Sequence, residues 1–137
     1  MATGGKIMAE KAKVLVVDDQ NGVLESFKEI LKIKDYEVVG FLNGKEALES
    51  MKTTKYDFAF VDIRMPEMDG IEVLKKIKEI DPTVEVIMVT AYADEENFSK
   101  AITLGAMEYL RKPFLMGEVY SFAERALRKR REKMGQK

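Results

Sequence analysis

The stretch "FAFVDIRMPEMDG", residues 58–70, ends an apolar run on a carboxylate, Asp62, and then turns at Pro66 and Gly70. A short apolar run bounded by turn residues is typical of a strand buried on both faces. Such a strand does not need a charge at its end, so Asp62 is a candidate to face a ligand. Whether it does depends on the residues that end the other strands.

Apolar β-rich runs alternate with helical patterns along the whole chain. We predict strands at residues 13–18, 36–41, 57–62, 84–90 and 107–112. Apolar residues at helical spacing follow each strand; Asn43 is placed to cap one of these helices and Gly105 to end another. This alternation predicts an α/β fold with a doubly wound five-stranded parallel sheet, order 2-1-3-4-5, flavodoxin-like, with helices on both faces.

The composition excludes several classes of site. The chain has 137 residues, 46% hydrophobic, a formal charge of −1, and neither Cys nor His. It therefore has no disulfides, no Ser-His-Asp triad and no zinc-histidine site. A bound metal ion would need oxygen ligands, which magnesium, calcium and manganese prefer. No apolar run approaches the roughly 18 residues of a membrane span, and the charge balance does not attract nucleic acid.

The chain length fits one domain, which we expect at residues 13–128. Residues 1–12 look like a short N-terminal tail. Residues 129–137 form a basic C-terminal tail, which is interpreted as the solvated end of the last helix or the start of a linker to an output domain.

The carboxyl ends of parallel strands lie at one edge of a sheet, where ligands bind. The predicted strand ends carry Asp18 and Asp19, Asp62, Thr90, and Lys112 before Pro113. Each residue alone has an ordinary structural explanation: a helix N-terminal acid, a turn residue, a β-branched strand residue or a surface lysine. Together they describe a phosphoryl site, because a divalent cation relieves the repulsion among carboxylates and one carboxylate can act as the nucleophile.

Four motifs together resemble the receiver domain of two-component response regulators over about residues 13–128: "VVDD" (16–19), "FVDIRMPEMDG" (60–70), "VTAYA" (89–93) and "LRKPF" (110–114). The resemblance implies that Asp62 is the phosphoacceptor. It also implies that Asp19 binds Mg²⁺ directly, that Asp18 binds it mainly through water, and that Asp62 and the backbone carbonyl of Arg64 complete the protein ligands.

The resemblance assigns the remaining site residues as well. Thr90 contacts the phosphoryl group and shifts on activation, and Tyr109 is the rotating switch aromatic. Lys112 pairs with Asp62 or its phosphate, and the Lys112–Pro113 bond is expected to be cis.

Two positions that vary among receivers, Arg64 and Tyr92, are expected to tune the phosphate lifetime. Neither is a carboxylate or an amide, which are the side chains best able to orient an attacking water. We therefore expect slow autodephosphorylation, with bulky Tyr92 hindering in-line water.

The function that follows is a phosphorylation-controlled switch in the cytoplasm. A histidine kinase or phosphotransfer protein donates the phosphoryl group, and no external substrate is turned over. A downstream target is expected at the face formed by the helix near 94–104, the strand 107–112 and the last helix. A dimer that forms on phosphorylation is also allowed, whereas membrane and direct nucleic-acid binding are not expected. The chain resembles stand-alone chemotaxis or sporulation-phosphorelay receivers, or the receiver of a larger, nitrogen-regulator-type DNA-binding transcription factor.

Two rivals belong to other classes. A magnesium-dependent phosphatase of the haloacid-dehalogenase type expects a second Asp two residues after the nucleophile, where this chain has Arg64. A flavodoxin-type binding module expects a loop rich in Ser, Thr and Gly after the first strand, where this chain has the acidic "DDQNG" (18–22).

Overall fold

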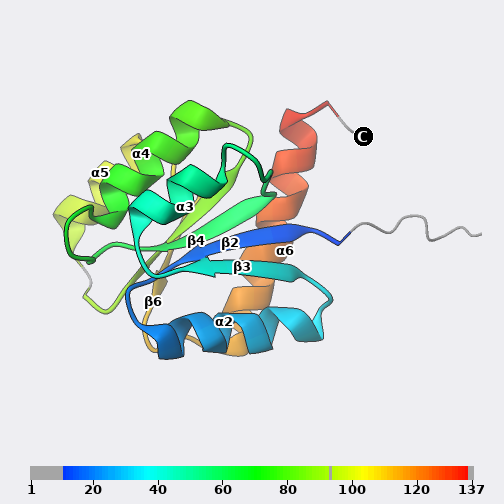
Figure 1. Ribbon diagram of the computed structural model, residues 1–137, viewed down its shortest axis with the longest axis horizontal. Coiled ribbons are helices and arrows are strands. Elements are labelled where there is room, and N and C mark those ends of the chain that lie inside the picture. Colours follow the sequence, from blue (N-terminus) through cyan, green and yellow to red (C-terminus); the bar gives the residue numbers. More distant parts are fainter. Residues whose placement is uncertain (1–10, 93, 136–137) are drawn as a thin grey trace, which may run out of the picture.

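The computed structural model describes residues 11–92 and 94–135 as five strands that alternate with five helices (Figure 1). The elements are β2 (Lys13–Val17), α2 (Asn21–Ile33), β3 (Glu37–Phe41), α3 (Gly44–Ser50), β4 (Phe58–Asp62), α4 (Gly70–Ile80), β5 (Glu85–Thr90), α5 (Glu95–Thr103), β6 (Glu108–Arg111) and α6 (Met116–Lys133). All pairings are parallel and the sheet order is β3-β2-β4-β5-β6, which confirms the predicted order 2-1-3-4-5.

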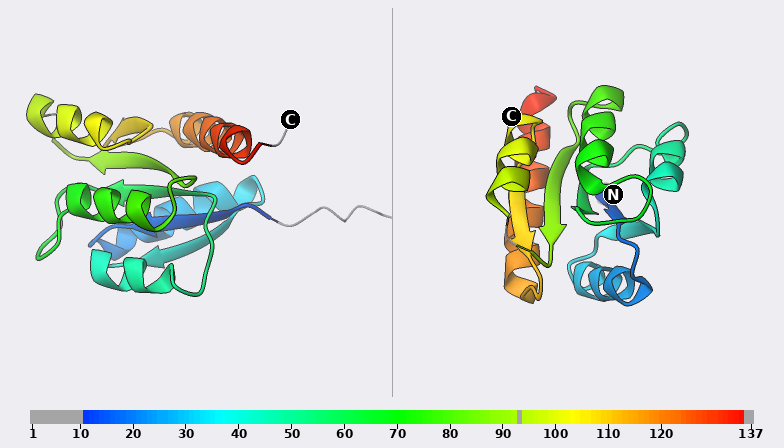
Figure 2. Two further views of the ribbon diagram at one scale, coloured as in Figure 1. Left: turned by 90° about the horizontal axis from the view of Figure 1, so that it is seen from above. Right: turned by 90° about the vertical axis from the view of Figure 1, so that its left-hand side faces the viewer.

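The sheet separates two apolar cores. Alternate residues of one strand enter opposite cores, as Leu15 and Val16 do, which explains why the central strands are apolar without interruption. One core contains the buried faces of α2 and α6, and the other contains those of α3, α4 and α5. In the right-hand view of Figure 2, β5 lies between α6 and α4. The predicted helices on both faces are therefore confirmed.

Side-chain caps begin three of the helices. Asn43 Oδ1 accepts a hydrogen bond from the Glu46 amide at 2.9 Å, and Asp69 Oδ1 accepts one from the Glu72 amide at 3.0 Å. Gly105 follows α5 with φ of +102°, a conformation that a residue with a side chain rarely adopts. The predicted cap at Asn43 and stop at Gly105 are confirmed.

The last helix runs beyond residue 128 and ends at Lys133, so residues 129–133 of the expected basic tail are helical. Three of its cations are held by acids at the amino ends of the strands or just before them. Arg125 pairs with Glu108 at 2.7 Å and Arg130 with Asp57 at 2.9 Å. The boundary at 128 stays a prediction, but it does not mark the end of the helix; residues 1–10 of the expected N-terminal tail lie outside the described residues.

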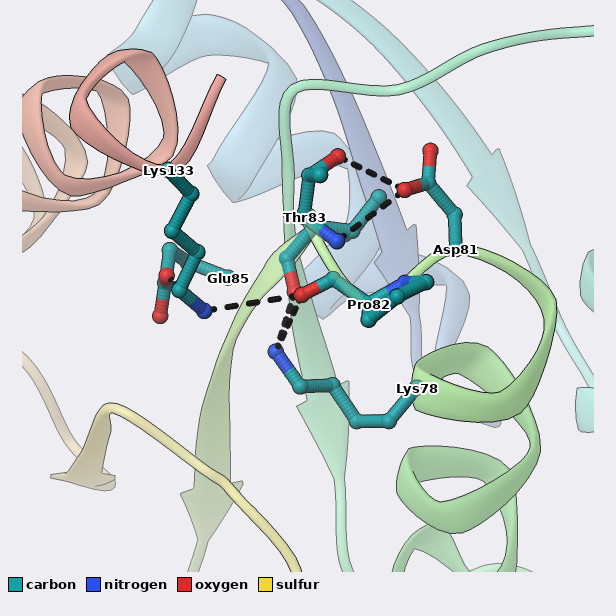
Figure 3. A network of polar contacts seen from close by, with 7 residues as sticks. Lys78, Asp81, Pro82, Thr83, Glu85 and Lys133 are labelled. Carbon is teal, nitrogen blue, oxygen red and sulfur yellow. Dashed lines mark hydrogen bonds and ion pairs between the residues drawn. The ribbon is translucent and has the colours of Figure 1, made fainter. Parts of the chain in front are cut away.

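The third cation, Lys133, lies 2.5 Å from a carboxylate oxygen of Glu85, a residue that is only 2% exposed (Figure 3). Beside it, Lys78 Nζ donates to the Val84 carbonyl at 2.8 Å. Burial, and then the positive charge of Lys133, lower the pKa of Lys78 to about 8. The end of α6 is thus fixed to the start of β5, at the opposite end of the strand from Thr90. None of the helices in the described ranges is long and apolar enough to cross a membrane.

Replacing Lys133 tests this anchor. Lys133→Met leaves the buried Glu85 carboxylate without its cation, so the free energy of unfolding should fall by about 1–3 kcal/mol in urea titrations. Lys129→Met, at an exposed position of the same helix, should change it by less than about 0.5 kcal/mol. Equal effects of the two substitutions would contradict a specific role for the Lys133–Glu85 pair.

Candidate functional site

The carboxyl edge of the sheet brings together the side chains that the sequence placed at strand ends. Asp18 and Asp19 follow β2, and Asp62 is the last residue of β4. Each offers a carboxylate oxygen, and these oxygens lie within 4.8 Å of one another. Asp18 and Asp62 are buried while Asp19 is exposed, so the cluster opens to solvent on the Asp19 side.

Lys112, which follows β6, reaches into this cluster. Its Nζ lies 3.0 Å from Asp18 Oδ2 and 3.8 Å from Asp62 Oδ1. The ammonium therefore sits between the two buried carboxylates, closer to Asp18 than to Asp62, with which the resemblance paired it. The expected cis Lys112–Pro113 bond is present.

The electrostatics of the site centre on Asp62. Burial, and then the charge of Asp18, raise the pKa of Asp62 to about 6; Lys112 and a hydrogen bond from the Arg64 backbone oppose the rise, while Asp19 adds to it. One ammonium does not balance three carboxylates at this distance. The all-oxygen donor set and its excess negative charge fit a hard divalent cation, which the carboxylates of Asp18, Asp19 and Asp62 could hold.

Gly70 explains why the chain breaks so soon after Asp62. A Cβ at position 70 would lie 2.0 Å from the carbonyl oxygen of Asp62, a distance that no side chain tolerates. The Gly70 amide instead donates to the Ile63 carbonyl at 2.8 Å, which sets α4 directly against the end of β4. The sequence analysis identified Gly70 only as a turn residue; the signal for its second role is its position directly after the capping Asp69.

Thr90 is buried at the end of β5, and its hydroxyl forms hydrogen bonds with the backbone of the loop that follows it. Oγ1 donates to the Tyr92 carbonyl at 2.8 Å and accepts from the Tyr92 amide at 3.0 Å. The Arg64 guanidinium lies 4.8 Å from the centre of the Tyr92 ring. Arg64 and Tyr92 were predicted as two separate rate-tuning positions, and the structure places them in contact.

Tyr109, in β6, is partly buried beside Phe98 of α5. The two rings meet edge to face, with centroids 5.2 Å apart and planes at 85°. The Tyr109 hydroxyl is buried without a hydrogen-bond partner among residues 11–92 and 94–135. Burial, and then the charge of Asp94, raise the pKa of Tyr109, while the neighbouring Thr90 side chain and the charge of Arg64 oppose the rise.

The raised pKa of Asp62 predicts how stability depends on pH. Between pH 3.8 and about 6 the folded chain holds the Asp62 proton more tightly than the unfolded chain does. The resulting stabilisation is present below pH 3.8 and is lost as pH rises through about 6. Without divalent cations, Asp62→Asn should therefore be more stable than the native chain at neutral pH by about 1–3 kcal/mol.

Urea unfolding near neutral pH and in mild acid measures this difference. The advantage of Asp62→Asn should shrink as the pH falls through the range in which Asp62 takes up its proton. Equal stability of the two proteins at neutral pH would show that the charge of Asp62 is not destabilising.

Comparisons with known proteins agree on one family. A family model described as the response regulator receiver domain matches residues 14–124. Sporulation initiation phosphotransferase F of Bacillus subtilis is 36% identical over 107 residues, which cover 78% of this chain and 86% of that protein. The transcriptional regulatory protein ZraR of Klebsiella oxytoca is 39% identical over 104 residues, which cover 76% of this chain but only 24% of ZraR.

A solved structure gives the same answer for the fold. The crystal structure of a CheY-like response regulator receiver domain protein from Methanospirillum hungatei matches with a TM-score of 0.87 and 31% identity. The match covers 90% of this chain and 99% of that one. The chain therefore spans most of a receiver domain protein and of the sporulation relative, and about a quarter of the transcriptional regulator.

Proposed function

The chain belongs to the response regulator receiver domain family, a family of signalling domains rather than substrate-turnover enzymes, and from this membership we propose that Asp62 is its site of phosphorylation. The observation that carries the proposal is the position of Asp62 at the carboxyl edge, beside Asp18 and Asp19 and within 3.8 Å of Lys112. A carboxylate in this setting is a nucleophile with positive charge available for the group that it attacks.

The donor is a phosphohistidine on a histidine kinase or phosphotransfer protein. A carboxylate oxygen of Asp62 attacks phosphorus and forms a P–O bond. The P–N bond breaks, its electron pair stays on the imidazole, and the imidazole takes a proton from solvent. Lys112 places its charge near the phosphoryl oxygens, and Thr90 donates a hydrogen bond once its hydroxyl leaves Tyr92.

Mg²⁺ would be held by Asp18, Asp19, Asp62 and the Arg64 carbonyl, with Asp18 acting mainly through water. When bound, it supplies positive charge that offsets the carboxylates and the transferred oxygens. The three clustered carboxylates support this assignment.

The signal leaves through the α5-β6-α6 face. Thr90 moves toward the phosphoryl group and Tyr109 fills the vacated space, which changes the affinity of this face for a downstream target or for a second copy of the chain. A groove there is lined by Asp94, Glu95, Phe98, Glu108, Tyr109 and Arg111. The switch residue Tyr109 is thus part of the proposed target surface, and we place the whole exchange in the cytoplasm.

A second candidate is the receiver of a larger DNA-binding regulator. The similarity to ZraR favours it, because the matched region is about a quarter of that protein. The receiver itself would not contact DNA in this case. The reading frame beyond Lys137 in the source gene distinguishes the two candidates.

Intact mass after incubation with acetyl phosphate and Mg²⁺ tests the acceptor. We expect a gain of one phosphoryl group, lost in Asp62→Ala and without Mg²⁺. Asp35→Asn serves as the control, because Asp35 is exposed and Asn tolerates its positive φ of 67°, so this variant should gain the same mass. A folded, magnesium-saturated native chain that gains no mass would refute the phosphorylation switch.

The lifetime of the phosphate tests the role of Arg64 and Tyr92. Because neither residue orients an attacking water and the Tyr92 ring hinders in-line approach, the phosphorylated chain should hydrolyse slowly. Arg64→Asn introduces an amide that can orient water and should shorten the half-life several-fold, whereas Lys52→Asn, far from the site, should not. A half-life of seconds for the native chain at neutral pH would contradict this expectation.

A further inference from the structure

Arg64, Tyr92 and Thr90 form a chain of contacts between the loop after β4 and the end of β5. Arg64 lies two residues after Asp62, and its guanidinium stacks on Tyr92 at 4.8 Å. The Tyr92 backbone in turn holds the Thr90 hydroxyl through hydrogen bonds of 2.8 and 3.0 Å. The side chain two positions after the proposed acceptor is therefore linked to the hydroxyl that has to move.

The Thr90 hydroxyl has a single proton, and it is donated to the Tyr92 carbonyl. Thr90 cannot donate to a phosphoryl oxygen until that bond breaks, so the conformation of the Tyr92 backbone decides when the hydroxyl is free. Tyr92 is 61% exposed, and the stacked Arg64 guanidinium restrains its ring.

We propose that Arg64 is a cation shared between two partners, an inference that rests on the phosphorylation of Asp62. In the unphosphorylated chain Arg64 stacks on Tyr92 and stabilises the loop that keeps the Thr90 hydroxyl away from Asp62. A phosphoryl group on Asp62 offers this guanidinium charge-assisted hydrogen bonds, which are stronger than a stack on an exposed ring. Arg64 then leaves Tyr92, the loop loosens and the Thr90 hydroxyl is released.

Arg64 is a positioning residue, because it links the arrival of the phosphoryl group to the movement of Thr90. Its effect depends on the Tyr92 ring but not on the Tyr92 hydroxyl, which makes no hydrogen bond with residues 11–92 or 94–135. That distinction provides a matched pair of variants, Tyr92→Leu without the ring and Tyr92→Phe with it.

The first experiment measures the affinity for beryllofluoride, a phosphoryl mimic, at saturating Mg²⁺ by calorimetric titration. Tyr92→Leu has no stack to break, so it should bind about 2- to 5-fold more tightly than the native chain. Tyr92→Phe should match the native chain. In an Arg64→Met background, Tyr92→Leu should give no further change, because the cation that it releases is already absent. Equal affinities for Tyr92→Leu and Tyr92→Phe, or full additivity with Arg64→Met, would overturn the proposal.

The second experiment follows the stack by NMR. The Arg64 side-chain Nε–H resonance, identified by its loss in Arg64→Met, should carry a ring-current shift that Tyr92→Leu abolishes. Saturation with Mg²⁺ and beryllofluoride should remove this shift in the native chain and move the Tyr92 amide resonance. A shift that survives saturation overturns the shared-cation proposal while leaving the acceptor intact. A native chain that does not bind beryllofluoride at all defeats the proposed function itself.

Discussion

The repulsion among three carboxylates at one edge of the sheet is the constraint on which the rest of the site depends. Asp18, Asp19 and Asp62 are held together by strands whose packing is fixed by two apolar cores, so they cannot separate. Lys112 offsets part of the charge, and burial together with the charge of Asp18 still raises the pKa of Asp62. The excess negative charge fits a divalent cation, and the proposed phosphorylation of Asp62 would use the positive charge that such an ion supplies.

The fold and the gathering of the strand-end side chains at one edge of the sheet could be predicted, because both follow from local patterns. Short apolar runs marked the strands and apolar residues at helical spacing marked the helices, and the parallel topology then brought every strand end to one edge. No knowledge of side-chain packing was needed to place four residues at that edge: Asp18, Asp62, Thr90 and Lys112. The carboxylate spacing, the contacts of Lys112 and the position of Thr90 at the end of β5 confirm that placement.

Other features depend on packing between segments that are distant in the sequence. The contact between Arg64 and Tyr92 joins two loops, and no local pattern reports it. The position of the Lys112 ammonium depends on a balance between two carboxylates, which spacing does not determine. The sequence shows the positive charges after residue 128 but not their partners, so the run was interpreted as solvated. The acids that pair with it, Asp57 and Glu85, lie far away in the sequence.

Gly70 carries no side chain, yet the space beside the Asp62 carbonyl leaves room for nothing larger. In a saturation mutagenesis scan scored by signalling output, position 70 would be as intolerant as the proposed acceptor, Asp62. A position that tolerates no substitution is usually taken to have a catalytic or binding role. At position 70 it would report only the small space between the end of β4 and the start of α4. The scores from such a scan would therefore identify the residues around the site, but they would not separate residues with a chemical role from residues that are needed only because they are small.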